Sequence, residues 1–129
     1  MYGHALSQMS DVARRELDWY LRDHLFRQSN AGKRAFRKEL LPGEMATLYL
    51  RYRNADLQQL SELMDPVVEG LVAKKVLERI GNELMMPGGM SRLQCAKCFY
   101  INYLLAIEPR ICLRCQHVDL HDFPNKRKA

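Results

Sequence analysis

The sequence predicts a mainly α-helical fold with a small β part, and three observations support this prediction. Apolar side chains recur at helical spacing over residues 10–28 and, in shorter stretches, over residues 44–54, 57–64 and 66–73. Apolar and polar residues then alternate over residues 76–80, and a Gly-Asn turn and a second extended segment follow. All four cysteines lie after residue 94 in two Cys-x-x-Cys pairs, which predicts a small C-terminal module.

The helix over residues 10–28 is expected to begin at a capping residue, either Ser10 or Asp11. The face that we expect to pack on the core contains Val12, Leu17, Tyr20, Leu21 and Leu25. The segment after this helix is rich in helix breakers and holds a basic cluster, Lys33, Arg34, Arg37 and Lys38. This cluster is either a phosphate-contacting loop or a solvated connection.

Two start signals divide the stretch after residue 54. Asp56 is placed to cap a helix in which Leu57, Leu60 and Leu63 face inward. Asp65 followed by Pro66 is a second start signal, because proline is favoured at the first position of a helix. The sequence therefore predicts two short helices in this stretch, followed by the two extended segments.

Helix, tight turn, helix and two extended segments joined by a glycine-bearing turn is the order of a winged helix-turn-helix. On these elements, residues 56–93 resemble the winged helix-turn-helix superfamily, and LVAKKVLERI at residues 71–80 is similar to the junction of the second helix and the wing. The chain departs from the pattern at Lys75, where many members have the glycine that ends the helix. The resemblance implies a winged-helix-like domain whose helices over residues 56–75 enter a groove of DNA.

The two cysteine pairs, Cys95 with Cys98 and Cys112 with Cys115, have the spacing of a four-thiolate metal site. Zinc is the expected ion, held in a C-terminal zinc ribbon. Four thiolates leave no open position for water, so the zinc is expected to be structural. The alternatives are iron in place of zinc, two disulfides in place of a metal site, and His117 or His121 as a ligand in place of a cysteine.

The segment between the cysteine pairs is far more apolar than a metal-closed hairpin needs for itself. These side chains pack on the same chain, on a second copy in a homodimer, or on a different protein. The candidate partner-binding residues are Phe99, Tyr100, Tyr103, Leu104 and Leu105.

The chain has 129 residues and a formal net charge of +5, which favours an anionic partner. The basic excess lies at the two ends, including a tail with Lys126, Arg127 and Lys128. The candidate residues for contacts to double-stranded DNA are Arg34, Arg37, Lys38, Arg51, Arg53, Gln58, Gln59, Lys74 and Lys75.

The sequence thus favours a cytoplasmic DNA-binding regulator of transcription of bacterial, phage or plasmid type, acting as a dimer. The alternative is a protein-binding adaptor or inhibitor that targets RNA polymerase or a host defence component through the apolar hairpin. A third hypothesis is an RNA binder that stacks bases on Tyr100 and Tyr103. No catalytic motif, signal peptide or membrane-spanning run is found in the sequence, so no enzyme is expected.

The expected organisation has four parts. Residues 1–43 form an N-terminal helix with a basic connection, and residues 44–93 form the winged-helix-like region. Residues 94–122 form the zinc ribbon, and residues 123–129 form the basic tail.

Overall fold

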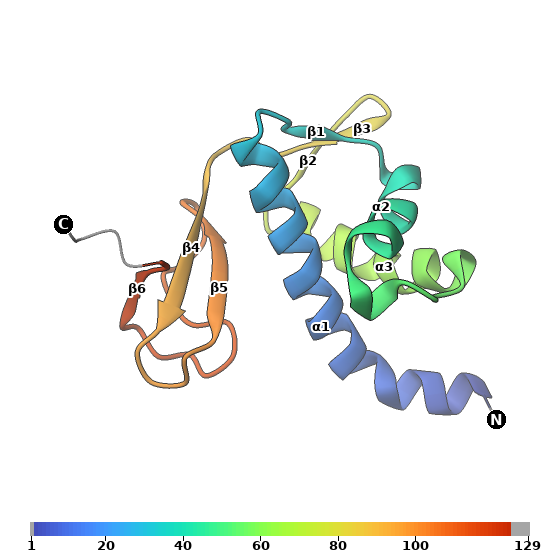
Figure 1. The fold of residues 1–129 in the computed structure, drawn as a ribbon, viewed down its shortest axis with the longest axis horizontal. Helices are drawn as coiled ribbons and strands as arrows, with labels where there is room; N and C mark the ends of the chain where they lie inside the picture. Colours follow the sequence, from blue (N-terminus) through green and yellow to red (C-terminus); the bar gives the residue numbers. More distant parts are fainter. Residues whose placement is uncertain (1, 125–129) are drawn as a thin grey trace.

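The computed structural model describes the backbone of residues 2–124 and the side chains of residues 11–124. Within these residues it has three α-helices and two three-stranded antiparallel sheets (Figure 1). The tail residues Lys126, Arg127 and Lys128 lie outside the described residues.

The helices are α1 (Tyr2–Asn30), α2 (Leu41–Leu48) and α3 (Leu57–Ala73), with the short 3-10 turns η1 (Lys38–Leu40) and η2 (Leu50–Tyr52) on either side of α2. The strands are β1 (Ala35–Phe36), β2 (Glu78–Ile80), β3 (Glu83–Met85), β4 (Met90–Cys95), β5 (Ile101–Leu105) and β6 (Leu120–Asp122). This is an α+β fold, so the prediction of a mainly α-helical fold is wrong. Strands of two or three residues, such as β1 and β6, are too short to give an alternating pattern in the sequence.

The three helices and the first sheet enclose the main core. This sheet has the strand order β1-β3-β2, and the β2–β3 turn contains Gly81 in a left-handed conformation that glycine adopts without strain. Each helix and the central strand contribute fully buried side chains, among them Leu21, Met45, Val68 and Leu84. Figure 1 shows α1 running between the second sheet on one side and α2 and α3 on the other.

Helix α1 begins at Tyr2, so Ser10 and Asp11 lie inside the helix and the predicted cap is wrong. The residues before Ser10 include good helix formers and no proline, so nothing there stops the helix from extending. Neither α1 nor any other helix of the described residues is apolar over the length that crossing a membrane requires.

Helix α2 begins and ends earlier than the helix predicted over residues 44–54. Pro42 lies in its first turn, where the missing N–H costs no hydrogen bond. The chain becomes extended at Tyr49, whose hydroxyl donates to the Asp23 carboxylate of α1 at 2.6 Å. This contact to another helix accounts for a break that the local sequence does not signal.

Residues 57–73 form one helix, although Asp65 and Pro66 predicted two. A continuous stripe of buried side chains holds α3 together across the proline, namely Leu60, Met64, Val67, Val68 and Leu71. Pro66 lies on the exposed face, where water can solvate the carbonyl that lacks its N–H partner. Asp56 is the N-cap, as predicted, and accepts hydrogen bonds from the N–H groups of Gln58 and Gln59.

The end of α3 is closed by a pair of backbone hydrogen bonds around Lys75. The Val76 N–H donates to the Leu71 carbonyl at 2.9 Å, and the Lys75 N–H donates to the Val72 carbonyl at 3.0 Å. This Schellman arrangement requires a left-handed residue after the helix, and Lys75 adopts it with a φ of 67°.

The second sheet has the strand order β5-β4-β6 and a small core of its own. We call residues 90–122 the ribbon. Its buried core consists of Leu93, Cys95, Leu104, Cys112 and Leu120. Leu105, next to Leu104 in β5, belongs instead to the main core, because successive side chains of a strand face opposite sides.

Hydrogen bonds from α1 to β5 hold the ribbon against the helices. The Trp19 indole N–H donates to the Ile101 carbonyl at 2.7 Å. Arg22, only 1% exposed, donates to the Tyr103 carbonyl and pairs with both carboxylate oxygens of Glu108 at 2.8 Å. Burial alone lowers the pKa of Arg22, but its bonds to Glu108 and Asp18 raise that pKa above the usual value. The guanidinium therefore stays charged at the interface.

Candidate metal centre

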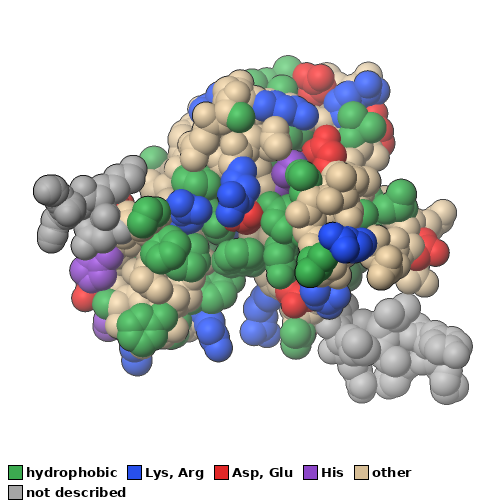
Figure 2. Space-filling model, viewed as in Figure 1, with side chains coloured by type: hydrophobic (Ala, Val, Ile, Leu, Met, Phe, Trp, Pro, Cys, Tyr) green, Lys and Arg blue, Asp and Glu red, His purple; other side chains and the backbone are tan. Residues whose placement is uncertain are grey.

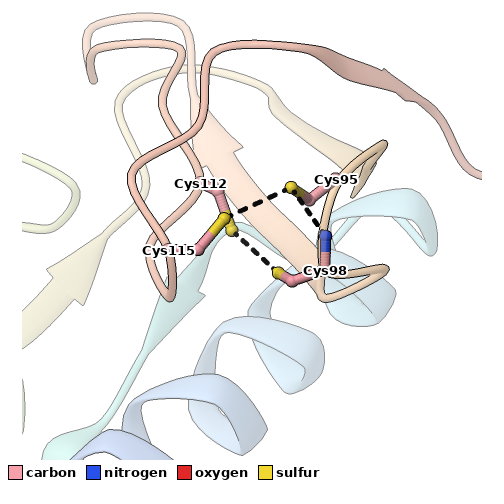
Figure 3. Close-up of side chains that lie close together, drawn as sticks. All are labelled: Cys95, Cys98, Cys112 and Cys115. Atoms are coloured by element: carbon pink, nitrogen blue, oxygen red, sulfur yellow. Dashed lines mark hydrogen bonds between the residues drawn. The ribbon is translucent and has the colours of Figure 1, made fainter.

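The side chains of Cys95, Cys98, Cys112 and Cys115 point toward one another at one end of the ribbon (Figure 3). Cys95 ends β4, and Cys98 lies in the turn that leads to β5. The other two cysteines lie in the segment between β5 and β6. Strand pairing of β4 with both β5 and β6 is what brings the two Cys-x-x-Cys turns together.

The distances between the sulfurs match a tetrahedral metal site. The Sγ atoms of Cys95 and Cys115 are 3.6 Å apart, those of Cys98 and Cys112 are 3.7 Å apart, and all four lie within 4.8 Å of one another. A tetrahedron with metal–sulfur bonds of about 2.3 Å has edges of roughly 3.8 Å. A disulfide needs about 2.05 Å, so the four thiols are free and could hold a metal ion.

Backbone N–H groups point at the first sulfur of each pair. The N–H groups of Lys97 and Cys98 donate to the Cys95 sulfur at 3.3 and 3.4 Å. The Arg114 N–H donates to the Cys112 sulfur at 3.4 Å. Such hydrogen bonds favour the thiolate form, which is the form that binds metal.

The pKa values of the thiols reflect these contacts. Burial raises the pKa of Cys112, but hydrogen bonds from backbone N–H groups and from Asn102 outweigh it and bring that pKa to about 6. The pKa of Cys95 is also lowered by N–H donors that outweigh its burial. A Tyr100 N–H lowers the pKa of Cys98, yet burial and the other sulfurs raise it to about 11. A metal cation among the sulfurs would stabilise the thiolates together.

Asn102 is a residue of this site that the sequence did not reveal. It is fully buried, its side-chain amide donates to the Cys112 sulfur at 3.5 Å, and its side-chain oxygen accepts from the Leu113 N–H at 2.8 Å. Asn102 therefore fixes the second Cys-x-x-Cys turn against β5. The signal was present, because Asn102 is the one amide side chain in the apolar run of residues 99–107.

Neither candidate histidine joins the cysteine cluster in the part of the chain that the structure describes. The backbone carbonyl of His117 accepts from the Cys112 N–H at 2.8 Å, so this residue supports the turn through its main chain. The His121 ring lies at the surface beside Asp119, at 3.2 Å.

Three of the five candidate partner-binding residues are covered by the chain itself. Tyr103, Leu104 and Leu105 are buried, so their assignment to a partner surface is corrected. Both faces of β5 are occupied, one by α1 and the main core and the other by the ribbon core. Tyr100 is partly covered by the Arg114 guanidinium at 5.9 Å from its ring centre, whereas Phe99 is 68% exposed.

The candidate DNA-contacting residues fall into separate groups. Arg51, Arg53, Gln58 and Gln59 lie close together in the sequence, where η2 leads into α3. Lys74 and Lys75 lie exposed at the other end of α3.

Each of the three remaining candidates forms an ion pair or a hydrogen bond within the chain. Arg37 pairs with Glu39 at 2.8 Å. Lys38 contacts Asp65 at 3.0 Å, and Arg34 donates to the Met86 carbonyl at 3.0 Å. Those three basic side chains are thus engaged within the chain and do not form one open patch.

Comparisons with protein-family models, with curated proteins and with solved structures found no match to this chain. The class of site that the geometry defines is a four-cysteine cluster able to hold a metal ion.

Proposed function

We propose that the protein is a DNA-binding regulator of transcription that uses a winged-helix-like arrangement and a structural zinc ion. The order α2, turn, α3 and the β2–β3 hairpin with its glycine turn supports this assignment. The net charge of +5 is consistent with a polyanionic partner.

The observation that carries the proposal is the polar start of α3. In a helix-turn-helix, the first residues of the second helix contact the edges of bases in the major groove. Because α3 is a single helix, that position belongs to Gln58 and Gln59, both exposed, and not to residues 66–73. Glutamine side chains pair with adenine in this groove. Arg53, the exposed C-cap of η2, precedes them and suits a phosphate contact, whereas Arg51 in η2 pairs with Glu16 at 2.9 Å.

Acidic residues on α3 are compatible with this interface because most of them are already engaged. The Asp56 carboxylate caps the helix. Lys38 contacts Asp65 at 3.0 Å and Glu69 at 3.4 Å, and Arg79 also pairs with Glu69. Hydrogen bonding from Arg79 lowers the pKa of Glu69. These cations reduce the repulsion that free carboxylates would exert on phosphates.

Zinc is the ion that we assign to the cysteine cluster. Four thiolates at tetrahedral spacing suit this ion, and bound zinc would close the ribbon without taking part in a reaction. Elemental analysis of the protein purified without added metal should find close to one zinc per chain. Iron in place of zinc, or less than about half an equivalent of metal, would contradict the assignment.

Duplex binding is measured by fluorescence anisotropy with a labelled random-sequence duplex of about 30 base pairs, at salt concentrations from about 50 to 200 mM. We expect steep weakening with salt, and Arg53→Ala should reduce the salt slope by about one. Arg110→Ala removes the same charge from the ribbon and is the matched control, expected to leave the slope unchanged.

Sequence preference is measured by selecting bound duplexes from the random pool. Gln58→Ala should relax the preference at one base position and cost about 1–3 kcal/mol at the selected site. Its affinity for unselected duplex should stay close to that of the natural chain. Absence of duplex binding at low salt would refute the proposal.

The second candidate function, a protein-binding adaptor, is favoured by one observation. Large apolar side chains remain exposed on the ribbon even after β5 is covered, namely Phe99, Ile107, Ile111, Leu113 and Val118. A chain that binds no duplex but is retained specifically by purified RNA polymerase would support the adaptor instead.

A further inference from the structure

Phe99 adopts a conformation that its own packing does not explain. Its φ is 66°, in the left-handed region that bulky residues rarely occupy. The turn imposes this conformation, since the Phe99 N–H donates to the Cys95 carbonyl at 2.9 Å and the Phe99 carbonyl accepts from the Gln94 amide at 3.1 Å. Glycine would fit the turn without strain, yet the chain places here an aromatic ring that is 68% exposed.

The second Cys-x-x-Cys turn provides a direct comparison. Gln116 holds the same position after Cys115 that Phe99 holds after Cys98, and its φ is 65°. Both turns therefore need a left-handed residue, and only the first uses an aromatic one. The difference points to a role for the Phe99 ring outside the turn itself.

The surface around Phe99 is basic. Lys97 lies one residue before Cys98, and Arg114 one residue before Cys115, so the close approach of the four sulfurs brings both cations to the end of the ribbon that carries Phe99. Neither cation has a carboxylate partner among the described residues. Glu108 is the one acidic residue over residues 95–118, and its carboxylate is paired with Arg22.

We call Lys97, Phe99 and Arg114 the ribbon tip. Figure 2 shows hydrophobic side chains with Lys or Arg side chains beside them at the lower end of the ribbon. An exposed ring near cations that have no carboxylate partner complements a ligand that carries both flat apolar faces and negative charge.

We infer that the ribbon tip binds single-stranded nucleic acid, stacking an unpaired base on Phe99 while Lys97 and Arg114 contact phosphates. A single strand is required because bases within a duplex have no free face for an aromatic ring. DNA and RNA strands share this chemistry. The inference uses a surface separate from the start of α3, so it does not depend on the proposed duplex binding.

The test is fluorescence anisotropy of the full chain with labelled oligo(dT) and oligo(U) of about 15 nucleotides. Phe99→Gly removes the ring while relaxing the left-handed position, so the variant should fold at least as well as the natural chain. We expect it to bind the single strand at least about tenfold more weakly. Gln116→Gly relaxes the other turn in the same way and is the matched control, expected to retain full binding.

The cations give a second readout. Lys97→Ala and Arg114→Ala should each lower the salt slope for the single strand by about 0.7. The two oligonucleotides distinguish the source of the strand, because preference for oligo(U) indicates RNA and preference for oligo(dT) indicates DNA.

Two results would overturn the inference. One is absence of single-strand binding at low salt, which would leave the ribbon tip available to a protein partner. The other is equal binding by Phe99→Gly and the natural chain. Duplex binding whose salt slope is unchanged in Phe99→Gly but reduced in Arg53→Ala would separate this inference from the proposed function.

Discussion

Lys75 has a left-handed backbone conformation that is unfavourable for a residue with a Cβ atom. It closes α3 from the left-handed region, its side chain is exposed, and glycine tolerates this conformation without the clash of a Cβ atom. The clash relieved in Lys75→Gly exceeds the extra entropy that glycine gives the unfolded chain. We expect the variant to gain about 0.5–1 kcal/mol in free energy of unfolding, measured by urea titration.

The neighbouring residue supplies the control for this prediction. Lys74 has ordinary right-handed angles, with a φ of −84° and a ψ of −1°. Lys74→Gly should therefore lose about 0.5–1 kcal/mol, because glycine only adds freedom to the unfolded chain. Equal effects of the two substitutions would contradict the account of the helix end.

Asp23 is a buried residue whose ionised side chain stabilises the fold. It accepts hydrogen bonds from the hydroxyls of Tyr49 and Tyr103 and from Arg27. Burial alone would raise its pKa, but these donors outweigh burial and hold the pKa below the usual 3.8. A carboxyl whose pKa is lower in the folded state stabilises the fold above the unfolded-state pKa, and this contribution is lost as the pH falls through the folded-state pKa.

Asp23→Asn should therefore cost about 2 kcal/mol at neutral pH, and the cost should shrink as the pH falls below about 4. Urea unfolding of both proteins at each pH gives the difference in their free energies of unfolding. Protonation of the thiols affects both proteins equally, so it cancels in this difference. Asp122→Asn, at an exposed carboxylate of β6, should change stability little at any pH. A cost that does not vary with pH would show that the charge of Asp23 contributes nothing.

At the scale of elements, the contact between α1 and β5 depends on the buried Arg22–Glu108 pair. Removing one partner of such a pair leaves an uncompensated buried charge, which costs about 3–5 kcal/mol. Arg22→Met, which keeps much of the apolar volume of the side chain, should lose this much stability in urea unfolding. The double variant Arg22→Met with Glu108→Gln should recover part of the loss, because the glutamine oxygen can still accept from the Leu105 N–H.

Because both variants replace Arg22 by methionine, recovery in the double variant measures the cost of the charge left on Glu108. If both variants lost the same stability, the other hydrogen bonds of the guanidinium, such as the one to the Tyr103 carbonyl, would be the main contribution of Arg22. Amide exchange of β5 should report the same difference, because β5 carries the carbonyl that Arg22 contacts.

The same interface explains which elements could be predicted from the sequence. Local patterns sufficed for Leu17, Leu21 and Leu25 on the buried face of α1, for the Asp56 cap and for the four cysteines. The same patterns were wrong for Val12 and Leu57, which were predicted to face the core and are exposed. The Arg22–Glu108 pair joins residues 86 positions apart in the sequence, so no local pattern predicts it. The two-residue strand β1 forms because it pairs with β3, and this pairing is likewise a tertiary contact.

At the scale of the whole molecule, β5 is shared by two cores. Leu104 packs in the ribbon core and Leu105 in the main core, while Tyr103 packs against Trp19 of α1. The ribbon core is small and includes two of the cysteines, so it has little apolar area with which to fold alone. A metal ion bound by the four cysteines would therefore supply much of its stability, together with the contact with α1.

Removal of one ligand should consequently unfold the ribbon before the helices. Cys98→Ser is expected to lose the metal and the amide protection of β4 and β5, because three thiolates bind the ion much more weakly. Protection in α3 should persist, since its buried stripe packs in the main core away from the cysteines. Hydrogen exchange by NMR measures both regions in one experiment, with His121→Ala as a surface control that keeps the metal. Full metal content in Cys98→Ser would refute four-cysteine ligation, whereas equal loss of protection in α3 and β4 would show that the two cores unfold as one cooperative unit through β5.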